Sequence, residues 1–318
     1  MQKNILWGAL LALTASVSWG AMFPVANHSF QYIDSFYFTI FRYIPVAIIL
    51  VIILWIKEGR QAFKIEGKNL PLWFFSIGFA VYNLFIFWGQ EMLGESGVLL
   101  ASIMESLMPM ISVLIIWAFK KQRPSLYTLS FIGLAFIGVF LVVTNGDIDF
   151  LLTIDKKLFP LFILFIAVIG WVLYTMGGDR FPDWSTLRYS TLSCLFGTTA
   201  ATVVVLITTA FGGVEAPTMQ EVFAVRYDML FMVIFPGLIA LLGWNVGVRI
   251  LKPINGLLFI SFVPVTTVII GFIQGYHLTA FDIVGTTFIV LALVLNNVYQ
   301  RFLLKKTAKR TGFDRPAA

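Results

Sequence analysis

Leu99-Leu-Ala-Ser-Ile-Met-Glu-Ser-Leu-Met-Pro-Met110 is the stretch from which the fold of this chain can be worked out. It lies within a long apolar run, yet it contains an acid, Glu105, and a proline four residues later, Pro109. In a helix each N–H donates to the carbonyl four residues back, and proline has no N–H to donate. If this stretch is helical, the carbonyl of Glu105 therefore loses its backbone partner at the level of the acid.

The rest of the chain is far too apolar for an ordinary soluble domain. Of its 318 residues, 59% are hydrophobic and 12% are charged, against about 25% charged residues in soluble domains. The mean hydropathy is +0.91. Apolar runs of about 20 residues recur, as a hydrocarbon core about 30 Å thick requires. We predict an all-α polytopic membrane protein with ten transmembrane helices, at 5–27, 35–56, 72–92, 96–119, 125–144, 159–178, 185–211, 229–250, 255–275 and 280–303.

The positive charges predict the orientation of these spans. Of the 22 Lys and Arg residues, seventeen fall in one set of alternate loops and three in the other set. Cytoplasmic loops carry the excess of Lys and Arg. We therefore predict a multi-pass protein of a bacterial-type plasma (inner) membrane with both termini in the cytoplasm. This topology explains the net charge of +6 without a nucleic-acid partner.

The opening stretch is repeated later in the chain. At one common offset, Pro109 falls on Pro264 and Ser106 falls on Ser261. Each half would then hold five spans, and because five is odd the second half enters the membrane from the opposite side. Such inverted repeats are common in secondary transporters, with the binding site near the midplane between the halves. The predicted organisation is a first five-helix repeat at 1–145, an outer connecting loop at 146–158, a second repeat at 159–303 and a basic cytoplasmic tail at 304–318.

Motifs in both halves resemble the EamA family of the drug/metabolite transporter superfamily. They are Trp19-Gly-Ala-Met-Phe23, Phe41-Arg-Tyr43, Glu105-Ser-Leu-Met-Pro109, Arg123-Pro-Ser125 and Gly138-Val139, then Gly243-Trp-Asn245, Phe262-Val-Pro264 and Gly285. The resemblance implies two inverted five-helix units, a central cavity and transport of small metabolites, often as efflux. The chain departs from the family pattern at Asn27, where many relatives have lysine, and at Gln122, where an acid often precedes Arg-Pro-Ser.

Glu105 is the sharpest candidate for a functional residue. An ionised carboxyl is costly inside a bilayer, and intramembrane acids are functional candidates by default. On a helix Ser102 and Glu105 share one face. Glu105 could carry protons or bind a substrate ammonium group, or it could bond a neighbouring helix structurally. The repeat-related position is Ile260, so any proton site would be asymmetric, whereas Pro109 and Pro264 mark a helix break in both halves.

Polar and aromatic residues deep in other spans are the remaining candidates for binding substrate. Ser76, Asn83 and Gln90 recur at intervals of seven and share one helix face, where amides can bind solute or join helices. Trp19 and Trp171 lie about twelve residues into their spans, too deep for an interfacial belt. A buried indole needs a partner for its N–H, so these rings either line a cavity or pack in the core. Tyr174, Trp244 and Asn245 complete the predicted binding set.

Other aromatic and basic residues have a simpler structural interpretation. Trp7, Trp55, Trp73, Trp117 and Trp184 lie near span ends, as an interfacial belt predicts. Arg42 and Arg188 lie one or two turns into related spans. That depth allows each guanidinium to reach the headgroups while its stem stays in the membrane, so we expect structural anchoring, with substrate binding as the alternative.

Together these features predict a secondary transporter that moves a small organic solute by alternating access. We expect the solute to be an amino acid or a related metabolite that is exported, and Glu105 could couple this export to protons. Aromatic and amide residues with a single acid suit a neutral or zwitterionic solute better than a polyanion. The alternatives are an uncoupled facilitator, an intramembrane enzyme acting on lipid or isoprenoid, and a non-transporting membrane subunit. We predict no catalytic residues, no cofactor and no metal site, because the chain has one Cys and two His residues and lacks motifs such as His-Glu-x-x-His. The expected partners are the solute and the lipid bilayer, and the sequence leaves the oligomeric state open.

Overall fold

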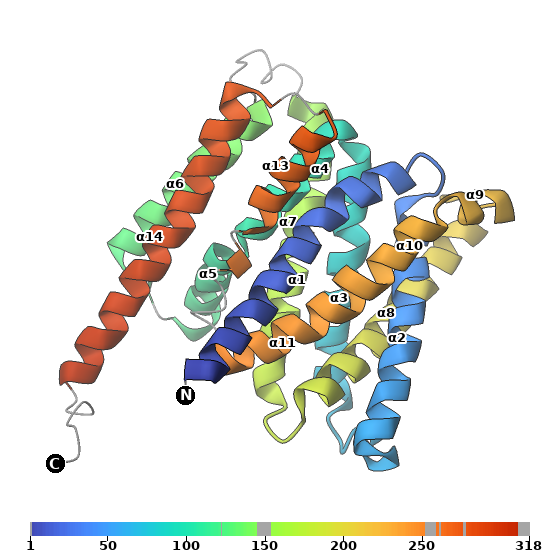
Figure 1. Cartoon of the computed structure of the whole chain (residues 1–318), viewed down its shortest axis with the longest axis horizontal. Coiled ribbons are helices and arrows are strands. Elements are labelled where there is room, and N and C mark those ends of the chain that lie inside the picture. Colours follow the sequence, from blue (N-terminus) through green and yellow to red (C-terminus); the bar gives the residue numbers. More distant parts are fainter. Residues whose placement is uncertain are drawn as a thin grey trace.

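The chain forms a bundle of long helices (Figure 1). A computed structural model describes residues 2–121, 123–144, 154–251, 259–260, 262–275 and 278–310. The helices of this described part are α1 (Gln2–Ser29), α2 (Ser35–Glu58), η1 (Arg60–Phe63), α3 (Asn69–Met92), α4 (Glu95–Ser106), α5 (Met108–Lys120), α6 (Leu126–Thr144), α7 (Ile154–Gly177), η3 (Gly178–Arg180), α8 (Thr186–Ala210), α9 (Met219–Ala224), α10 (Arg226–Met232), η4 (Val233–Ile239), α11 (Ala240–Leu251), α13 (Phe262–Ile273) and α14 (Ala280–Arg310).

Many of these helices can cross a membrane. Within the described residues, seven segments are long and apolar enough to span it, one of them the continuous run Arg226–Leu251 through α10, η4 and α11. The bent pair α4 and α5 is an eighth candidate. Two shorter apolar helices, Phe262–Ile273 and Ala280–Asn296, lie at predicted spans. The chain is therefore an all-helical, multi-pass membrane protein.

The helix over residues 99–110 is broken close to Pro109, as the missing proline N–H predicts. α4 ends at Ser106, Leu107 donates its N–H to the carbonyl of Met104 (3.1 Å), and Pro109 lies in the first turn of α5. The axes of α4 and α5 differ by 45°. The single span predicted at 96–119 is thus two helices that meet beside Glu105. Pro264 likewise lies in the first turn of α13.

Close helix pairs hold the bundle together. α6 packs along α14, and α3 packs along α7. Glycines make both crossings possible, because a Cβ added at Gly138 would lie 2.6 Å from the carbonyl oxygen of Gly285, and one at Gly78 would lie 2.8 Å from that of Gly170. α1 lies against both α11 and α13, and it crosses the centre of the view in Figure 1.

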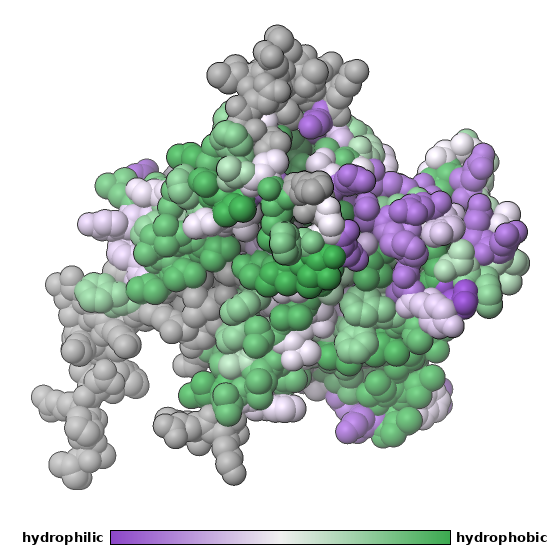
Figure 2. All heavy atoms as spheres, turned by 45° about the horizontal axis from the view of Figure 1, so that its top comes forward, coloured by the Kyte–Doolittle hydropathy of each residue, from purple (hydrophilic) through white to green (hydrophobic). Residues whose placement is uncertain are grey.

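The surface of the bundle suits a lipid environment. Figure 2 shows hydrophobic residues over much of the visible face, while hydrophilic residues gather at the side where α9 and α10 lie in Figure 1. Trp7, Trp55, Trp73 and Trp117 are exposed, in keeping with the predicted interfacial belt. The belt prediction is wrong for Trp184, which is 4% exposed because Arg188 covers its ring, with Cζ 4.4 Å from the ring centroid.

The two ends of the described chain lie at the same end of the bundle. Figure 1 places the beginning of α1 and the end of α14 together at the bottom of the view. Part of the predicted tail 304–318 continues α14 as far as Arg310, and residues 311–318 lie outside the described part. Gln122, Ser261 and residues 145–153, which include most of the predicted connecting loop 146–158, also lie outside the described part.

Candidate functional site

A cluster of aromatic rings fills the middle of the bundle. Trp19 of α1 lies edge-on to Trp171 of α7, with ring centroids 5.5 Å apart, and 5.3 Å from Trp244 of α11. Trp171 in turn contacts Tyr82 of α3 at 4.6 Å and Tyr174 of α7 at 5.0 Å. All five side chains are less than 6% exposed. These residues, from four helices far apart in the sequence, are called the aromatic cluster below.

Trp19 is held in this cluster by an irregular helix. Its Nε1–H donates to the carbonyl oxygen of Pro236 at 3.3 Å. Pro236 lies inside the π-helical segment η4, where backbone hydrogen bonding departs from the regular α-helical pattern. The indole N–H that the sequence analysis required to be bonded therefore has a backbone partner. Segments of this kind are frequent at functional sites.

Glu105 lies directly beside the aromatic cluster. It is 1% exposed near the end of α4, and the hydroxyl of Tyr82 donates to its Oε1. Its Oε2 has no hydrogen-bond partner among the described residues. The acid thus has one oxygen fixed by a cluster tyrosine and one oxygen free to accept a further bond.

Arg42 does not occupy the position that the sequence analysis expected. Its side chain is 1% exposed and is among the largest fully buried side chains of the described residues, so the prediction that it reaches the headgroups is wrong. Depth along α2 allowed that reach, but Arg42 faces inward, with Cζ 4.5 Å from the ring centroid of Tyr43 and 5.6 Å from that of Phe87. The repeat-related Arg188 does lie near a loop, where it bonds the carbonyl of Lys64 and forms an ion pair with Glu66.

The predicted polar face of α3 is buried inside the bundle. Ser76 and Gln90 are 0% exposed and Asn83 is 1% exposed. The Gln90 amide donates to the carbonyl of Phe23 on α1 at 2.8 Å, and the Asn83 amide donates to the carbonyl of Phe79 on its own helix. The amide oxygens of both residues have no partner among the described residues. Each of these amides therefore donates to a helix carbonyl and keeps an amide oxygen without a partner among the described residues.

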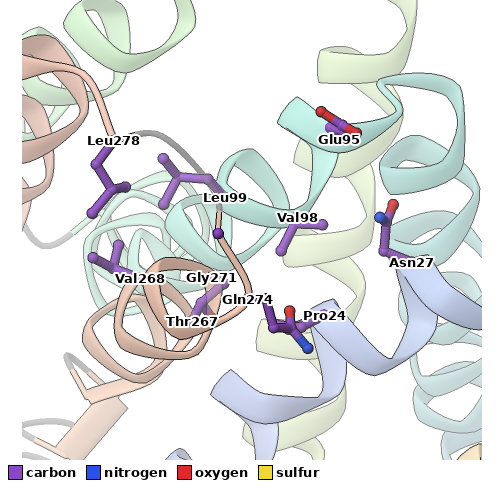
Figure 3. A pocket seen from close by; sticks show the side chains of 11 residues that line it. Pro24, Asn27, Glu95, Val98, Leu99, Thr267, Val268, Gly271, Gln274 and Leu278 are labelled. Carbon is purple, nitrogen blue, oxygen red and sulfur yellow. The ribbon is translucent and has the colours of Figure 1, made fainter.

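A first pocket lies at one end of α1 and adjoins α4 and α13. It has a volume of about 240 Å³. Figure 3 shows polar Asn27, Glu95 and Gln274 around it, together with apolar side chains such as Val98. Its lining residue Thr267 bonds the carbonyl oxygen of Gly20 at 2.8 Å, one residue beyond Trp19. Ser102, one turn beyond the lining residue Leu99, is buried and donates to the Leu99 carbonyl.

A second pocket lies at the opposite end of the bundle. It has a volume of about 380 Å³ and is lined by residues of α7, α8 and α11 and of the turn between α7 and α8, among them Tyr189, Trp244, Asn245 and Arg249. Asn245 donates to the Ser190 hydroxyl at 2.7 Å. Tyr189 stacks on Tyr174, with ring centroids 5.6 Å apart. The second pocket therefore ends against the aromatic cluster.

The aromatic cluster thus lies between the two pockets. Trp244 belongs to both the cluster and the second pocket, and Trp19 is next to the residue that Thr267 of the first pocket bonds. Trp19, Asn83 and Glu105 line neither of these pockets and are each less than 5% exposed. In this structure the middle of the bundle is closed between two pockets that open at opposite ends.

Tyr82 is the site residue that the sequence analysis missed. It lies about as deep in α3 as Trp19 does in α1, so the same argument from depth applies to its hydroxyl. Tyrosine is also common at interfaces, which made it inconspicuous beside Asn83. Within the part of the chain that the structure describes, no group of three or more His, Cys, Asp or Glu residues is placed to hold a metal ion.

Comparison with known sequences identifies the family. The sequence profile described as "EamA-like transporter family" matches residues 6–144 and again residues 158–298. The chain belongs to the EamA-like transporter family. The resemblance inferred from the motifs is therefore confirmed, and the chain is a membrane transporter and not an enzyme.

The relatives of this EamA transporter point the same way. It is 51% identical to "Uncharacterized transporter YrdR" of Bacillus subtilis (strain 168), over 95% of this chain and 94% of that one. It is 26% identical to "Uncharacterized transporter YyaM" of the same organism, over 90% and 92%. A solved structure described as "Crystal structure of protein" is 16% identical and covers 92% of this chain and 97% of its own, with a TM-score of 0.66. That likeness supports the fold alone.

Proposed function

We propose that this EamA transporter moves a small organic solute, an amino acid or a related metabolite, by alternating access through the middle of the bundle. The observation that carries the proposal is the aromatic cluster with Glu105, buried between two pockets at opposite ends of the bundle. In alternating access the site opens to one side of the membrane at a time, so it must lie between two openings at opposite ends of the bundle.

The proposed architecture is ten spans in two inverted repeats, at 1–145 and 159–303. The bent pair and the two shorter apolar helices would bring the span count to ten. Helix packing supports the inversion, because α1 packs on α11 as α7 packs on α3, so the first span of each half lies against the third span of the other. Both termini are proposed to be cytoplasmic in the bacterial plasma membrane, on the side that holds most Lys and Arg.

We propose export as the direction and Glu105 as the proton carrier. The second pocket would then be the cytoplasmic entrance and the first pocket the outer exit. A buried acid with one oxygen that has no partner among the described residues can exchange a proton and a ligand in turn as the site opens to either side. A facilitator of the same fold would need no such acid.

Flux measurements in proteoliposomes test this proposal. Labelled amino acids should cross membranes that contain the purified protein faster than they cross protein-free liposomes, and an imposed pH gradient should accelerate the flux. Glu105→Gln should abolish the acceleration, whereas Glu91→Gln, at the end of α3, should preserve it. Acceleration retained in Glu105→Gln would refute the coupling role, and flux that never responds to the gradient would identify a facilitator.

A further inference from the structure

Arg42 is a buried cation that has few hydrogen-bond partners among the described residues. A guanidinium has five N–H donors in a planar fork. The Nη1 group of Arg42 approaches only the sulfur of Met22, at 3.8 Å, and Nε has no partner among the described residues. The rings of Tyr43 and Phe87 cover the group but accept no in-plane bond. Burying a charge without such partners is costly, so these donors are suited to bind an acceptor group of a ligand.

Glu105 is an acidic side chain in the same region. It interacts electrostatically with Arg42, yet the three ion pairs found within the described residues do not include these two. Two buried charges that only neutralised one another would gain most from direct contact. Here the two groups form no ion pair, and each keeps an atom without a hydrogen-bond partner among the described residues, Nε in Arg42 and Oε2 in Glu105.

The surroundings of the two charges differ in a way that fits two groups of one solute. Arg42 offers a flat fork of donors, which matches a carboxylate in two parallel bonds. Glu105 offers an acceptor oxygen beside Tyr82, whose ring lies against Trp171. Aromatic faces and a carboxylate both attract an ammonium group. The aromatic cluster would cover the remaining, apolar part of the solute.

We propose that Arg42 and Glu105 form the two poles of a binding site for a zwitterion, with Arg42 binding the carboxylate and Glu105 binding the ammonium group. This inference rests on the proposed transport function and specifies the substrate class of the same site. It assigns Arg42 to substrate recognition, although its relative in the repeat, Arg188, is already paired within the protein.

Binding to the purified full-length protein tests both poles without any mutation. Two matched series remove one charge at a time: L-phenylalanine, 2-phenylethylamine and 3-phenylpropionate, and L-leucine, isoamylamine and 4-methylpentanoate. Stabilisation against heat reports binding by mass action. At least one amino acid should bind at least about tenfold more tightly than both of its single-charge analogues. An amine or an acid that binds as well as its parent amino acid would overturn the inference.

Variants then assign each pole to its residue. Arg42→Gln should remove the preference for the amino acid over the amine, and Glu105→Gln should remove the preference over the acid. Arg42→Lys keeps the charge but not the fork and should retain part of the preference. Arg226→Gln, at an exposed position, should change nothing. Unchanged selectivity in well-folded Arg42→Gln or Arg42→Lys would refute the role of Arg42.

The failure of this inference is distinguishable from failure of the transport proposal. Proteoliposomes that carry a solute of another class, while no member of the two series binds, would refute the zwitterion site and leave transport standing. Absence of both binding and flux would refute both proposals.

Discussion

Replacing Tyr82 by phenylalanine removes a single hydroxyl from the middle of the bundle. That hydroxyl donates to Glu105 Oε1, and the two side chains are 4% and 1% exposed, so water cannot take its place without rearrangement. Since Oε2 is already unpartnered, the variant leaves the carboxyl with no described bond. A buried acceptor left unsatisfied costs about 1–3 kcal/mol, and the substitution opens little extra space.

A double-mutant cycle in detergent micelles measures this interaction. The free energy of unfolding, followed by circular dichroism with increasing denaturing detergent, should fall by about 1–3 kcal/mol in Tyr82→Phe. In a Glu105→Leu background the same substitution should cost less than about 0.5 kcal/mol, because the acceptor is gone and groups in contact are not additive.

A matched control uses a tyrosine hydroxyl elsewhere in the bundle. The hydroxyl of Tyr37 bonds that of Thr209 at 2.9 Å, between α2 and α8 and without contact to Glu105. Tyr37→Phe should cost the same in both backgrounds. If Tyr82→Phe also costs the same with and without Glu105, the proposed pairing of Tyr82 and Glu105 is refuted.

Three further predictions follow from the contacts described above. Gly138→Leu should destabilise the protein by about 1–3 kcal/mol or more, because its Cβ would lie 2.6 Å from the carbonyl oxygen of Gly285. Gly133→Leu on the same helix serves as the control, because a Cβ at Gly133 meets nothing within 4 Å. Equal melting temperatures of the two variants would contradict the α6–α14 crossing. Trp19→Phe should lose the bond to Pro236, which should lower the free energy of unfolding by about 0.5–1.5 kcal/mol. Hydrogen exchange should rise in η4, and unchanged protection there would show that the bond does not hold the segment. The backbone N–H and the hydroxyl of Thr218 donate to Glu221 and lower its pKa, so its carboxylate stabilises the start of α9 above the ordinary glutamate pKa, and this contribution is lost as the pH falls through the lowered pKa. The amide protection factors of α9 should fall with it in the native protein but not in Glu221→Gln, and a pH dependence that persists in Glu221→Gln would point to another group.

Features set by the local sequence were predictable. The length of the apolar runs indicated the membrane spans, and the missing N–H of Pro109 indicated the break between α4 and α5. The depth of Trp19 and Trp171 in their spans separated them from interfacial tryptophans, and both belong to the aromatic cluster. These inferences needed only distance along a helix.

Features set by helix rotation and packing were not predictable in the same way. The position of Arg42 along α2 was consistent with a guanidinium at the headgroups, but the side chain faces the bundle interior. The pairing of Tyr82 with Glu105 joins α3 to α4 and has no sequence spacing that reveals it. The two pockets depend on how α1 sits between α11 and α13, which the sequence pattern does not specify. The roles of the predicted binding residues remain predictions.

Reciprocal accessibility of the two pockets tests the central claim most directly. The native Cys194 is buried and would be replaced by alanine. Single cysteines would then be introduced at Val268 in the first pocket and at Val248 in the second. Labelling rates with a hydrophilic maleimide would be measured with and without the solute identified by flux. Alternating access around the aromatic cluster predicts that the solute changes the two rates in opposite directions. Rates that change in the same direction, or not at all, would contradict it.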